Sequence, residues 1–259
     1  MAYSVNLNAD MGEGWGAYKI GDDAGILDVI GSASIACGFH AGDPVTMHDV
    51  VKMAKEKGVS VGAHPGFNDL WGFGRRPITM RADELEYVVA YQIGALQAMA
   101  AYCGIKVTHL KPHGALNNMA AVDHEYALAI GRAIKAVDRS IIYVALSGSQ
   151  MEKAGRELGL PVAREGFCDR HYDDDGNLTS RRLPNAMIKD PAEAVRQVVG
   201  MVTKGEFLSR HGNPVKVAVD TLCVHGDEPT AVAMARKIRA GLEAAGIKVV
   251  PLPEIKLHG

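Results

Sequence analysis

Short runs of β-branched and aromatic residues alternate with helix-forming segments along almost the whole chain. The runs with strand character span residues 3–8, 33–37, 59–63, 107–111, 141–146, 162–165, 215–224 and 248–250. Between most of them, apolar residues recur at spacings of three and four, which is the period of a helix that buries one face. Strands that alternate with helices through short connections form a parallel sheet covered by helices. This pattern predicts an α/β fold.

The number of candidate strands favours closure of that sheet into a barrel. The chain of 259 residues is long enough for one large core, and no internal repeat, low-complexity tract or linker divides it. We therefore predict one domain over residues 1–259, a distorted (β/α) barrel of seven or eight mostly parallel strands. A doubly wound open sheet is the second alternative.

The clearest predicted helix spans residues 85–103, with Asp83 and Glu84 in its first turn. Another helix is expected to begin at Asp43-Pro44, where an N-cap residue precedes proline at the first helical position. Asp43 therefore has two readings, as a helix cap and as a residue that lines a pocket.

Composition excludes several classes of function. The net charge is −2, and lysine and arginine are spread through the chain without the basic stripe of a nucleic-acid-binding protein. Residues 1–10 carry Asn and Asp where a signal peptide needs a basic and then an apolar stretch, and no run approaches the ~20 apolar residues of a membrane span. The cysteines form no C-x-x-C pair, so we expect reduced thiols. These features predict a cytoplasmic protein that binds neither nucleic acid nor membrane.

Polar residues able to do chemistry follow the predicted strands directly. These segments span residues 6–14, 36–44, 62–67, 109–117, 165–170 and 223–229. Of the ten histidines, five lie in them: His40, His64, His109, His113 and His225. A parallel β/α protein builds its active site at the carboxyl ends of its strands. The segments therefore predict one shared site, although a single histidine such as His109 is more often a core residue.

Alternation along a strand sharpens this prediction. Asn8 and Asp10 share one face of the first strand, and His109, Lys111 and His113 share one face of the fourth if it stays extended. Polar side chains inside a barrel are costly to bury without partners. We therefore expect these side chains to face a site.

Two long connections carry arginines. Residues 71–76 combine spaced glycines with Arg75 and Arg76, which suits either an anion-binding flap or a solvated basic loop. Arg170 lies in the connection over residues 166–189, close enough to a strand end to reach the pocket.

Several catalytic motifs are missing from the sequence. There is no Walker A motif, so a nucleotide would be held by another device or another subunit. There is also no G-x-S-x-G elbow and no H-E-x-x-H pair, which disfavours a serine nucleophile at residues 147–149 and a zincin site.

Together, the strand-end motifs closely resemble those of the LamB/YcsF family over nearly the whole chain. The motifs are VNLNADMGE (5–13), ACGFHAGD (36–43), GAHP (62–65), LKPHGAL (110–116) and VHGD (224–227). The resemblance implies a distorted (β/α) barrel related to the glycoside hydrolase/deacetylase superfamily. It also implies an A subunit that works with B and C subunits to open the lactam of 5-oxoproline to glutamate at the expense of ATP. For this chemistry we expect Mg²⁺ as a further cofactor.

Such a reaction needs cations for phosphate and carboxylate, a base for water, and donors for an oxyanion. The expected catalytic residues are Asp10, His40, His64, Lys111 and His113, and the expected substrate- or phosphate-binding residues are Asn8, Glu13, Asp43, Arg75, Arg76, Arg170 and His225.

Two other functions stay open at this point. The first is a stand-alone divalent-metal-dependent amidohydrolase or deacetylase, in which Asp10, His64 and His113 would bind the ion that activates water. The second is a non-catalytic subunit that delivers substrate to its partners. The density of strand-end histidines argues against the second, because binding a carboxylate rarely needs so many titratable groups.

Overall fold

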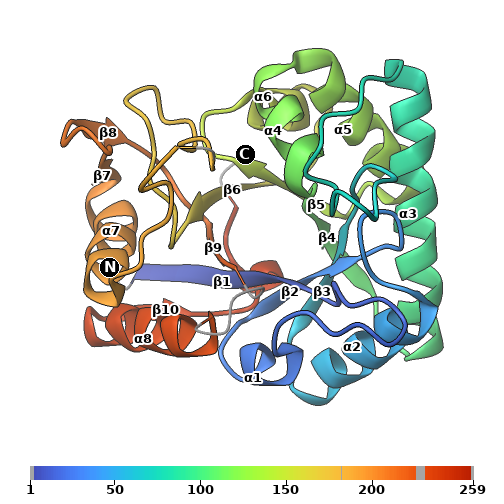
Figure 1. Cartoon of the computed structure of the whole chain (residues 1–259), viewed down its shortest axis with the longest axis horizontal. Helices are drawn as coiled ribbons and strands as arrows, with labels where there is room; N and C mark the ends of the chain where they lie inside the picture. Colours follow the sequence, from blue (N-terminus) through green and yellow to red (C-terminus); the bar gives the residue numbers. More distant parts are fainter. Residues whose placement is uncertain (1–2, 182, 226–230, 258–259) are drawn as a thin grey trace.

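The computed structural model describes residues 3–181, 183–225 and 231–257, and within them a closed parallel barrel lies at the centre (Figure 1). The last two residues of the VHGD motif lie outside these ranges. The ring follows the order β1-β2-β3-β4-β5-β6-β9, and β9 pairs in turn with β1 to close it. The strands are β1 (Tyr3–Met11), β2 (Ser32–Ala36), β3 (Ser60–His64), β4 (Val107–Leu110), β5 (Ile142–Leu146), β6 (Val162–Phe167) and β9 (Thr221–Val224). The prediction of a (β/α) barrel is confirmed, with seven strands in the ring.

The predicted strand near the carboxyl terminus lies outside the ring. It is β10 (Ile247–Val249), which pairs in parallel with the first residues of β1, from Tyr3 to Val5. The next part of β1, from Asn6 to Ala9, pairs with β9 instead. The long strand β1 therefore pairs with both β10 and β9 on the same edge. The ring closes through β9 and contains seven strands.

The prediction of a single strand over residues 215–224 is wrong. The segment divides into β8 (Pro214–Lys216), which forms an antiparallel hairpin with β7 (Glu206–Leu208), and the barrel strand β9. Between them, the Asp220 carboxylate accepts hydrogen bonds from the backbone N–H and the guanidinium of Arg164 on β6. Strand propensity is continuous through the segment, but its two ends belong to different sheets.

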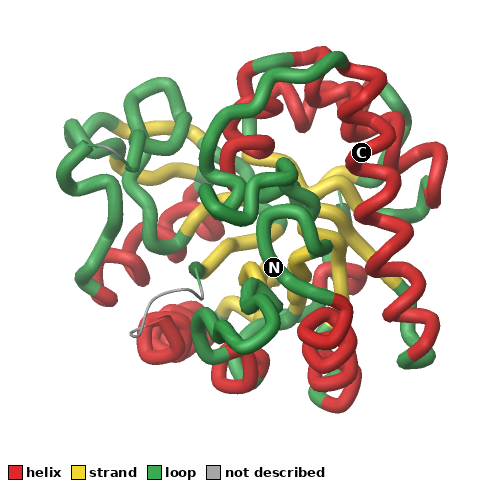
Figure 2. The backbone as a smooth tube through the Cα atoms, turned by 45° about the vertical axis from the view of Figure 1, so that its right-hand side comes forward, coloured by secondary structure: helices red, strands yellow, loops and turns green. Residues whose placement is uncertain are grey.

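Helices form the outer layer around the barrel (Figure 2). They are α1 (Asp23–Leu27), α2 (Pro44–Glu56), α3 (Ala82–Tyr102), α4 (Gly114–Val122), α5 (His124–Asp138), α6 (Gln150–Glu157), α7 (Pro191–Lys204) and α8 (Ala231–Ala244), with a short 3₁₀ turn, η1 (Leu252–Glu254). The helix predicted over residues 85–103 is confirmed as α3.

The start of α2 decides between the two readings of Asp43. Its carboxylate accepts hydrogen bonds from the backbone N–H groups of Val45 and Thr46 and from the Thr46 hydroxyl, and also from Gly16 N–H. Partial burial acts to raise the pKa of Asp43, but these bonds outweigh it and lower the pKa to about 2. Asp43 is therefore an N-cap, and its contribution to a substrate site stays a prediction.

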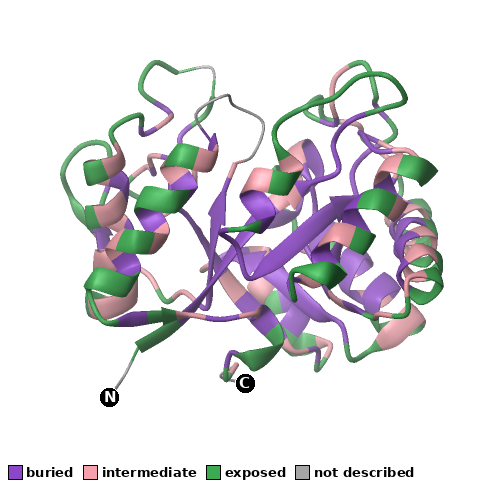
Figure 3. Cartoon of the chain, turned by 90° about the horizontal axis from the view of Figure 1, so that it is seen from below, coloured by how far each residue is buried: buried purple, intermediate pink, exposed green. Residues whose placement is uncertain are grey.

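Burial follows from this layering, because the barrel strands have helices outside and packed side chains inside (Figure 3). Strands β2 and β5 are buried at every residue, as expected for a sheet covered on both faces. No helix within the described ranges is long and apolar enough to cross a membrane.

Candidate functional site

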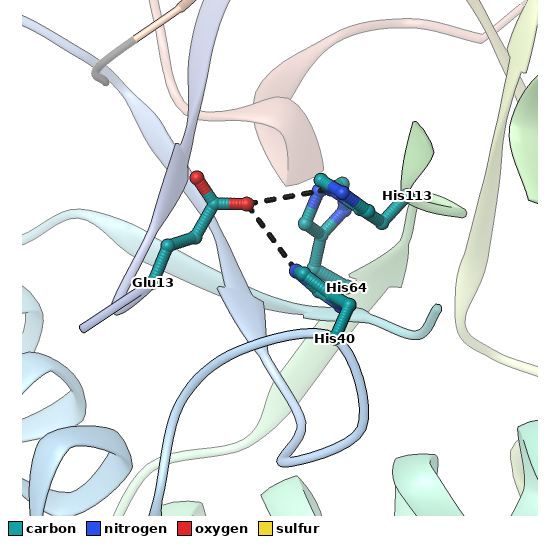
Figure 4. A group of neighbouring side chains, drawn as sticks. All are labelled: Glu13, His40, His64 and His113. Atoms are coloured by element: carbon teal, nitrogen blue, oxygen red, sulfur yellow. Dashed lines mark hydrogen bonds and ion pairs between the residues drawn. The ribbon is translucent and has the colours of Figure 1, made fainter. Parts of the chain in front are cut away.

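Three histidines and one glutamate meet at the carboxyl end of the barrel (Figure 4). Glu13 follows β1, His40 follows β2, His64 ends β3, and His113 lies between β4 and α4. One ligand atom from each lies within 4.8 Å of the others, and all four residues are buried. The sequence predicted each of them as a site residue, and the fold brings them together because parallel strand ends converge at one rim.

The tautomers of two histidines follow from their partners. His64 Nδ1 lies 2.7 Å from the carbonyl oxygen of Lys111, and His113 Nε2 lies 2.8 Å from that of Phe73. A carbonyl only accepts, so these two nitrogens donate, and in neutral rings His64 Nε2 and His113 Nδ1 carry lone pairs. These two atoms face each other at 3.0 Å, and Glu13 Oε1 lies 3.3 Å from His113 Nδ1. Acceptor atoms that converge in this way are the arrangement that binds a cation.

The surroundings keep two of the rings neutral. Burial, followed by the neighbouring His64, lowers the pKa of His113 to about 3. Burial and the charges of His113 and His64 hold the pKa of His40 well below its usual value. Neutral imidazoles are the form that ligates metals. Three nitrogen donors and one carboxylate suit zinc or another first-row transition ion, whereas Mg²⁺ prefers oxygen ligands in an octahedron. The four residues thus fit a transition metal and do not fit the expected Mg²⁺.

A buried lysine occupies the centre of the barrel mouth beside this cluster. Lys111 Nζ lies 2.7 Å from Asp10 Oδ1, 3.2 Å from Glu165 Oε1 and 3.1 Å from Asn8 Oδ1. Burial disfavours the ammonium, but Asp10, then Cys223, then Glu165 outweigh it and hold the pKa of Lys111 well above its usual value. The lysine is therefore a fixed positive charge.

Asp10 joins the lysine to the histidine cluster. Its second oxygen, Oδ2, lies 3.4 Å from His64 Nε2. Burial acts to raise the pKa of Asp10, but His64 and Lys111 outweigh this effect. They hold the pKa of Asp10 well below its ordinary value, so the carboxyl is ionised. Asp10 thus lies between the two halves of the site and contacts both.

A histidine–aspartate pair lies after the ends of β9 and β6. His225 Nδ1 lies 2.8 and 2.9 Å from the two oxygens of Asp169 and donates to them. His225 Nε2 lies 2.8 Å from a guanidinium nitrogen of Arg181, which can only donate, so Nε2 carries a lone pair. The ring of Phe167 connects this pair to the centre, because it stacks on His225 and lies 5.6 Å from Lys111 Nζ.

The loop before α3 lies over the histidine cluster. The ring of Phe73 meets His40 and His113 edge-on, at centroid distances of 5.8 and 5.3 Å. A Cβ added at Gly74, which has a positive φ of 60°, would lie 2.6 Å from the His40 side chain and 2.8 Å from His113. A side chain at this position would therefore displace the ligating rings.

The predicted arginine clamps have structural partners. Arg76 pairs with the buried Asp69 and so closes the loop, while the Arg75 guanidinium lies over the Phe73 ring at 4.9 Å. Arg170 is buried and donates to the carbonyls of Thr179 and Ala186, and burial lowers its pKa to about 10. Binding of substrate or phosphate by these three arginines stays a prediction.

Several contributors to the site were not predicted from the sequence. Glu165, Cys223, Asp169, Arg181 and Phe73 contact its central residues. The signal for both acids was present, since Glu165 ends a predicted strand and Asp169 follows it. Phe73 and Arg181 come from long connections, and their sequence gives no indication of where such loops fold.

Fold and site together define a parallel (β/α) barrel whose polar centre lies at the carboxyl ends of the strands, as in barrel enzymes. A model of the LamB/YcsF family matches residues 5–257. The chain belongs to the LamB/YcsF family.

Relatives and solved structures support this membership. A protein from Rhodopseudomonas palustris, named as the A subunit of 5-oxoprolinase, is 53% identical over 248 residues, which cover 95% of this chain and 98% of the relative. Another of the same name, from Methylococcus capsulatus, is 50% identical over 97% of both chains. The crystal structure of a lactam utilization protein from Thermus thermophilus superposes with a TM-score of 0.91 at 44% identity, covering 95% of this chain and 99% of that one. A deacetylase, T48, solved with substrate, has a TM-score of 0.52 at 15% identity over 97% of this chain and 89% of its own, which is a likeness of fold.

Proposed function

We propose that this protein is the A subunit of an ATP-dependent 5-oxoprolinase, which opens the lactam of 5-oxo-L-proline to L-glutamate. The observation that carries the proposal is the buried Lys111, held charged between Asp10 and Glu165 at the barrel mouth. The names of the relatives, which refer to 5-oxoprolinase and to lactam utilization, agree with it. These relatives are named as one subunit of an enzyme, which supports a complex of several subunits. We propose that the partners are the B and C subunits and that the complex is cytoplasmic.

The reaction requires activation of a poor electrophile. In the proposed sequence, the lactam oxygen attacks the terminal phosphorus of ATP, an O–P bond forms, and ADP leaves. Water then adds to the activated carbon and the ring C–N bond breaks, which leaves the phosphoryl group on the new carboxyl as an acyl phosphate. A second water hydrolyses this acyl phosphate to glutamate and phosphate. We assign to Lys111 the stabilisation of the negative charge that develops on the substrate oxygen, because a preorganised buried cation stabilises such charge strongly.

Proton transfers are assigned to the histidine–aspartate pair. The Arg181 guanidinium donates to the lone pair on His225 Nε2, and in the proposed reaction it turns to a substrate anion so that this lone pair accepts a proton from the attacking water. Asp169 stabilises the resulting imidazolium through Nδ1–H. The same ring can then donate that proton to the departing nitrogen. Asp10 contacts both Lys111 and His64 and positions them. It is a poor base because its pKa lies well below its ordinary value.

A second candidate function is a stand-alone metal-dependent amidohydrolase or deacetylase, and the histidine cluster favours it. His40, His64, His113 and Glu13 would hold the ion, which when bound would supply Lewis-acid activation of water or of a carbonyl. The Mg²⁺ expected from the family resemblance would then accompany ATP rather than these four side chains.

The deciding experiment measures glutamate and ADP from 5-oxoproline and ATP, with this protein alone and with its B and C partners. We expect coupled turnover that requires all three proteins and yields one ADP per glutamate. Turnover of an amide or an acetylated sugar by this protein alone, without ATP, would favour the second function. Absence of coupled turnover with folded partners would contradict the first.

Metal analysis tests the cluster independently of activity. After purification without chelating resins and dialysis, we expect about one equivalent of a first-row transition ion per chain, read by elemental analysis. His113→Ala should lose it. His124→Ala is the matched control, because His124 pairs with Glu157 on the exposed side of the molecule and should retain the ion. Equal metal content in both variants would exclude the cluster as the site.

A further inference from the structure

A cavity of about 310 Å³ opens at the ends of β5 and β6, and none of the four residues of the histidine cluster lines it. Its walls come from the ends of β5 and β6, the last turn of α4, the first turn of α6, the turn over residues 175–177, and the β7–β8 hairpin with the residues that follow it. This volume is within the usual range for a small-molecule site. The chemical steps assigned to the barrel mouth leave this cavity without a role.

The start of α6, at Ser149 and Gln150, lines this cavity. Ser149 is the N-cap residue, yet no side chain caps this helix, so its first N–H groups lack that partner. Ser149 lines the cavity and is 7% exposed, and its buried hydroxyl has no hydrogen-bond partner within the described residues. A buried hydroxyl without a partner costs free energy unless a ligand or water completes it.

The charges of the lining restrict the ligand. Asp175 and Glu165 face the cavity against a single cation, Lys216, which pairs with Glu206 on the adjacent strand. These two carboxylates would repel a bare phosphate inside the cavity. Hydroxyls, amide groups and carboxylates together instead suit a neutral ligand that both donates and accepts hydrogen bonds.

The remaining lining is apolar and includes aromatic rings. Tyr172 and Phe207 are buried with their centroids 4.4 Å apart, and Val215 and Val217 complete that wall. An apolar wall opposite a polar rim is what a heterocyclic base with an attached sugar requires.

The position of the cavity connects it to the reaction. Glu165 lines the cavity and also lies 3.2 Å from Lys111 Nζ, so one carboxylate forms the wall between cavity and catalytic centre. The histidine cluster comes from β1 to β4 and their loops, whereas the cavity lies at β5 and β6. Lys111 therefore lies between the histidine cluster and the cavity.

We propose that this cavity receives the nucleoside portion of the nucleotide, with its phosphate chain outside the cavity on the side of Lys111, so that the two lining carboxylates face the nucleoside and not the phosphates. The inference rests on the proposed function, because it assigns the site of the ATP that the reaction consumes. It places nucleotide recognition in this chain without a Walker A loop: the first turn of α6 and Ser149 supply donors, Asp175 supplies an acceptor, and the apolar wall packs against the base.

The test is equilibrium binding of adenosine, ADP and inorganic phosphate by calorimetry, to the full chain and to its complex with the partner subunits. We expect adenosine and ADP to compete for one site per chain and inorganic phosphate not to compete. Val217→Trp, which fills the cavity from a partly exposed position, should weaken ADP binding by more than about tenfold, and Ser149→Ala by about fivefold. Val45→Trp, at an exposed position on α2, is the matched control and should bind as the parent does.

The same variants separate this inference from the proposed function. In the complex, Val217→Trp should raise the KM for ATP and leave the KM for 5-oxoproline unchanged, with far-ultraviolet circular dichroism confirming its fold. Coupled turnover with an unchanged KM for ATP, or no ADP binding to either the chain or the complex, would overturn the cavity assignment. Failure of coupled turnover with intact adenosine binding that Val217→Trp removes would instead reject the reaction and retain the cavity.

Discussion

Replacing Lys111 with methionine is expected to reduce coupled turnover by about 10³-fold and to destabilise the fold. The turnover loss follows because a preorganised charge at the developing oxyanion contributes on that order to kcat. The stability loss follows because Asp10 and Glu165 would remain buried without their cation. Breaking a buried ion pair from one side costs about 3–5 kcal/mol. Steady-state kinetics and urea denaturation would measure the two effects on the same preparation.

A double variant separates the two effects of this substitution. Lys111→Met combined with Glu165→Gln removes one of the two stranded carboxylates, so part of the lost free energy of unfolding should return. Turnover should not return, because the cation is still missing. Recovery of activity together with stability would mean that Lys111 acts only by holding the fold together.

The sequence predicted the central half of the site because strand ends were recognisable. Asp10, His64, Lys111 and His113 each end or follow a predicted strand, and hydrogen bonds or ion pairs connect all four. A parallel barrel leaves little freedom at such positions, since each carboxyl end faces the same mouth. Strand position alone was therefore enough to gather them.

The partners of the loop arginines and the β7–β8 hairpin were not predicted from the sequence. Arg76 and Arg170 have the charge of an anion clamp, but Asp69 and two backbone carbonyls satisfy them in the structure. Side-chain chemistry indicates what an arginine can bind and does not indicate which neighbour the folded loop supplies. The division of residues 215–224 has a similar cause, because β propensity does not specify a pairing partner.

The histidine tautomers and the cavity could not be predicted from the sequence, because they depend on tertiary packing. The convergence of lone pairs at His64 and His113 depends on which carbonyls accept from their other nitrogens, and one of these belongs to Phe73 in a distant loop. Likewise, Ser149 at the start of a helix is typical of a capping residue, yet its hydroxyl caps no N–H group and the residue lines the cavity. Only the packing of the folded chain supplies such partners.

Replacing Asp169 with asparagine is expected to reduce kcat by about 10²- to 10⁴-fold while leaving the KM for both substrates nearly unchanged. Asp169 accepts from His225 Nδ1 and so keeps the lone pair on Nε2, where the Arg181 guanidinium donates to it. In the proposed reaction this guanidinium moves aside and the lone pair accepts the proton of water. An asparagine amide can donate to Nδ1, which would move the ring proton to Nε2 and remove the base.

A second histidine–aspartate pair in the same part of the chain provides the control. His211 Nδ1 lies 3.2 Å from Asp174 Oδ2, and both side chains are about half exposed at 51% and 49%. Asp174→Asn therefore makes the same chemical change away from the barrel mouth and should leave kcat unaltered. Asp169→Glu should restore part of the activity, because it retains an acceptor for Nδ1–H. If Asp169→Asn instead raises both KM values at constant kcat, the pair positions ligands and does not transfer protons.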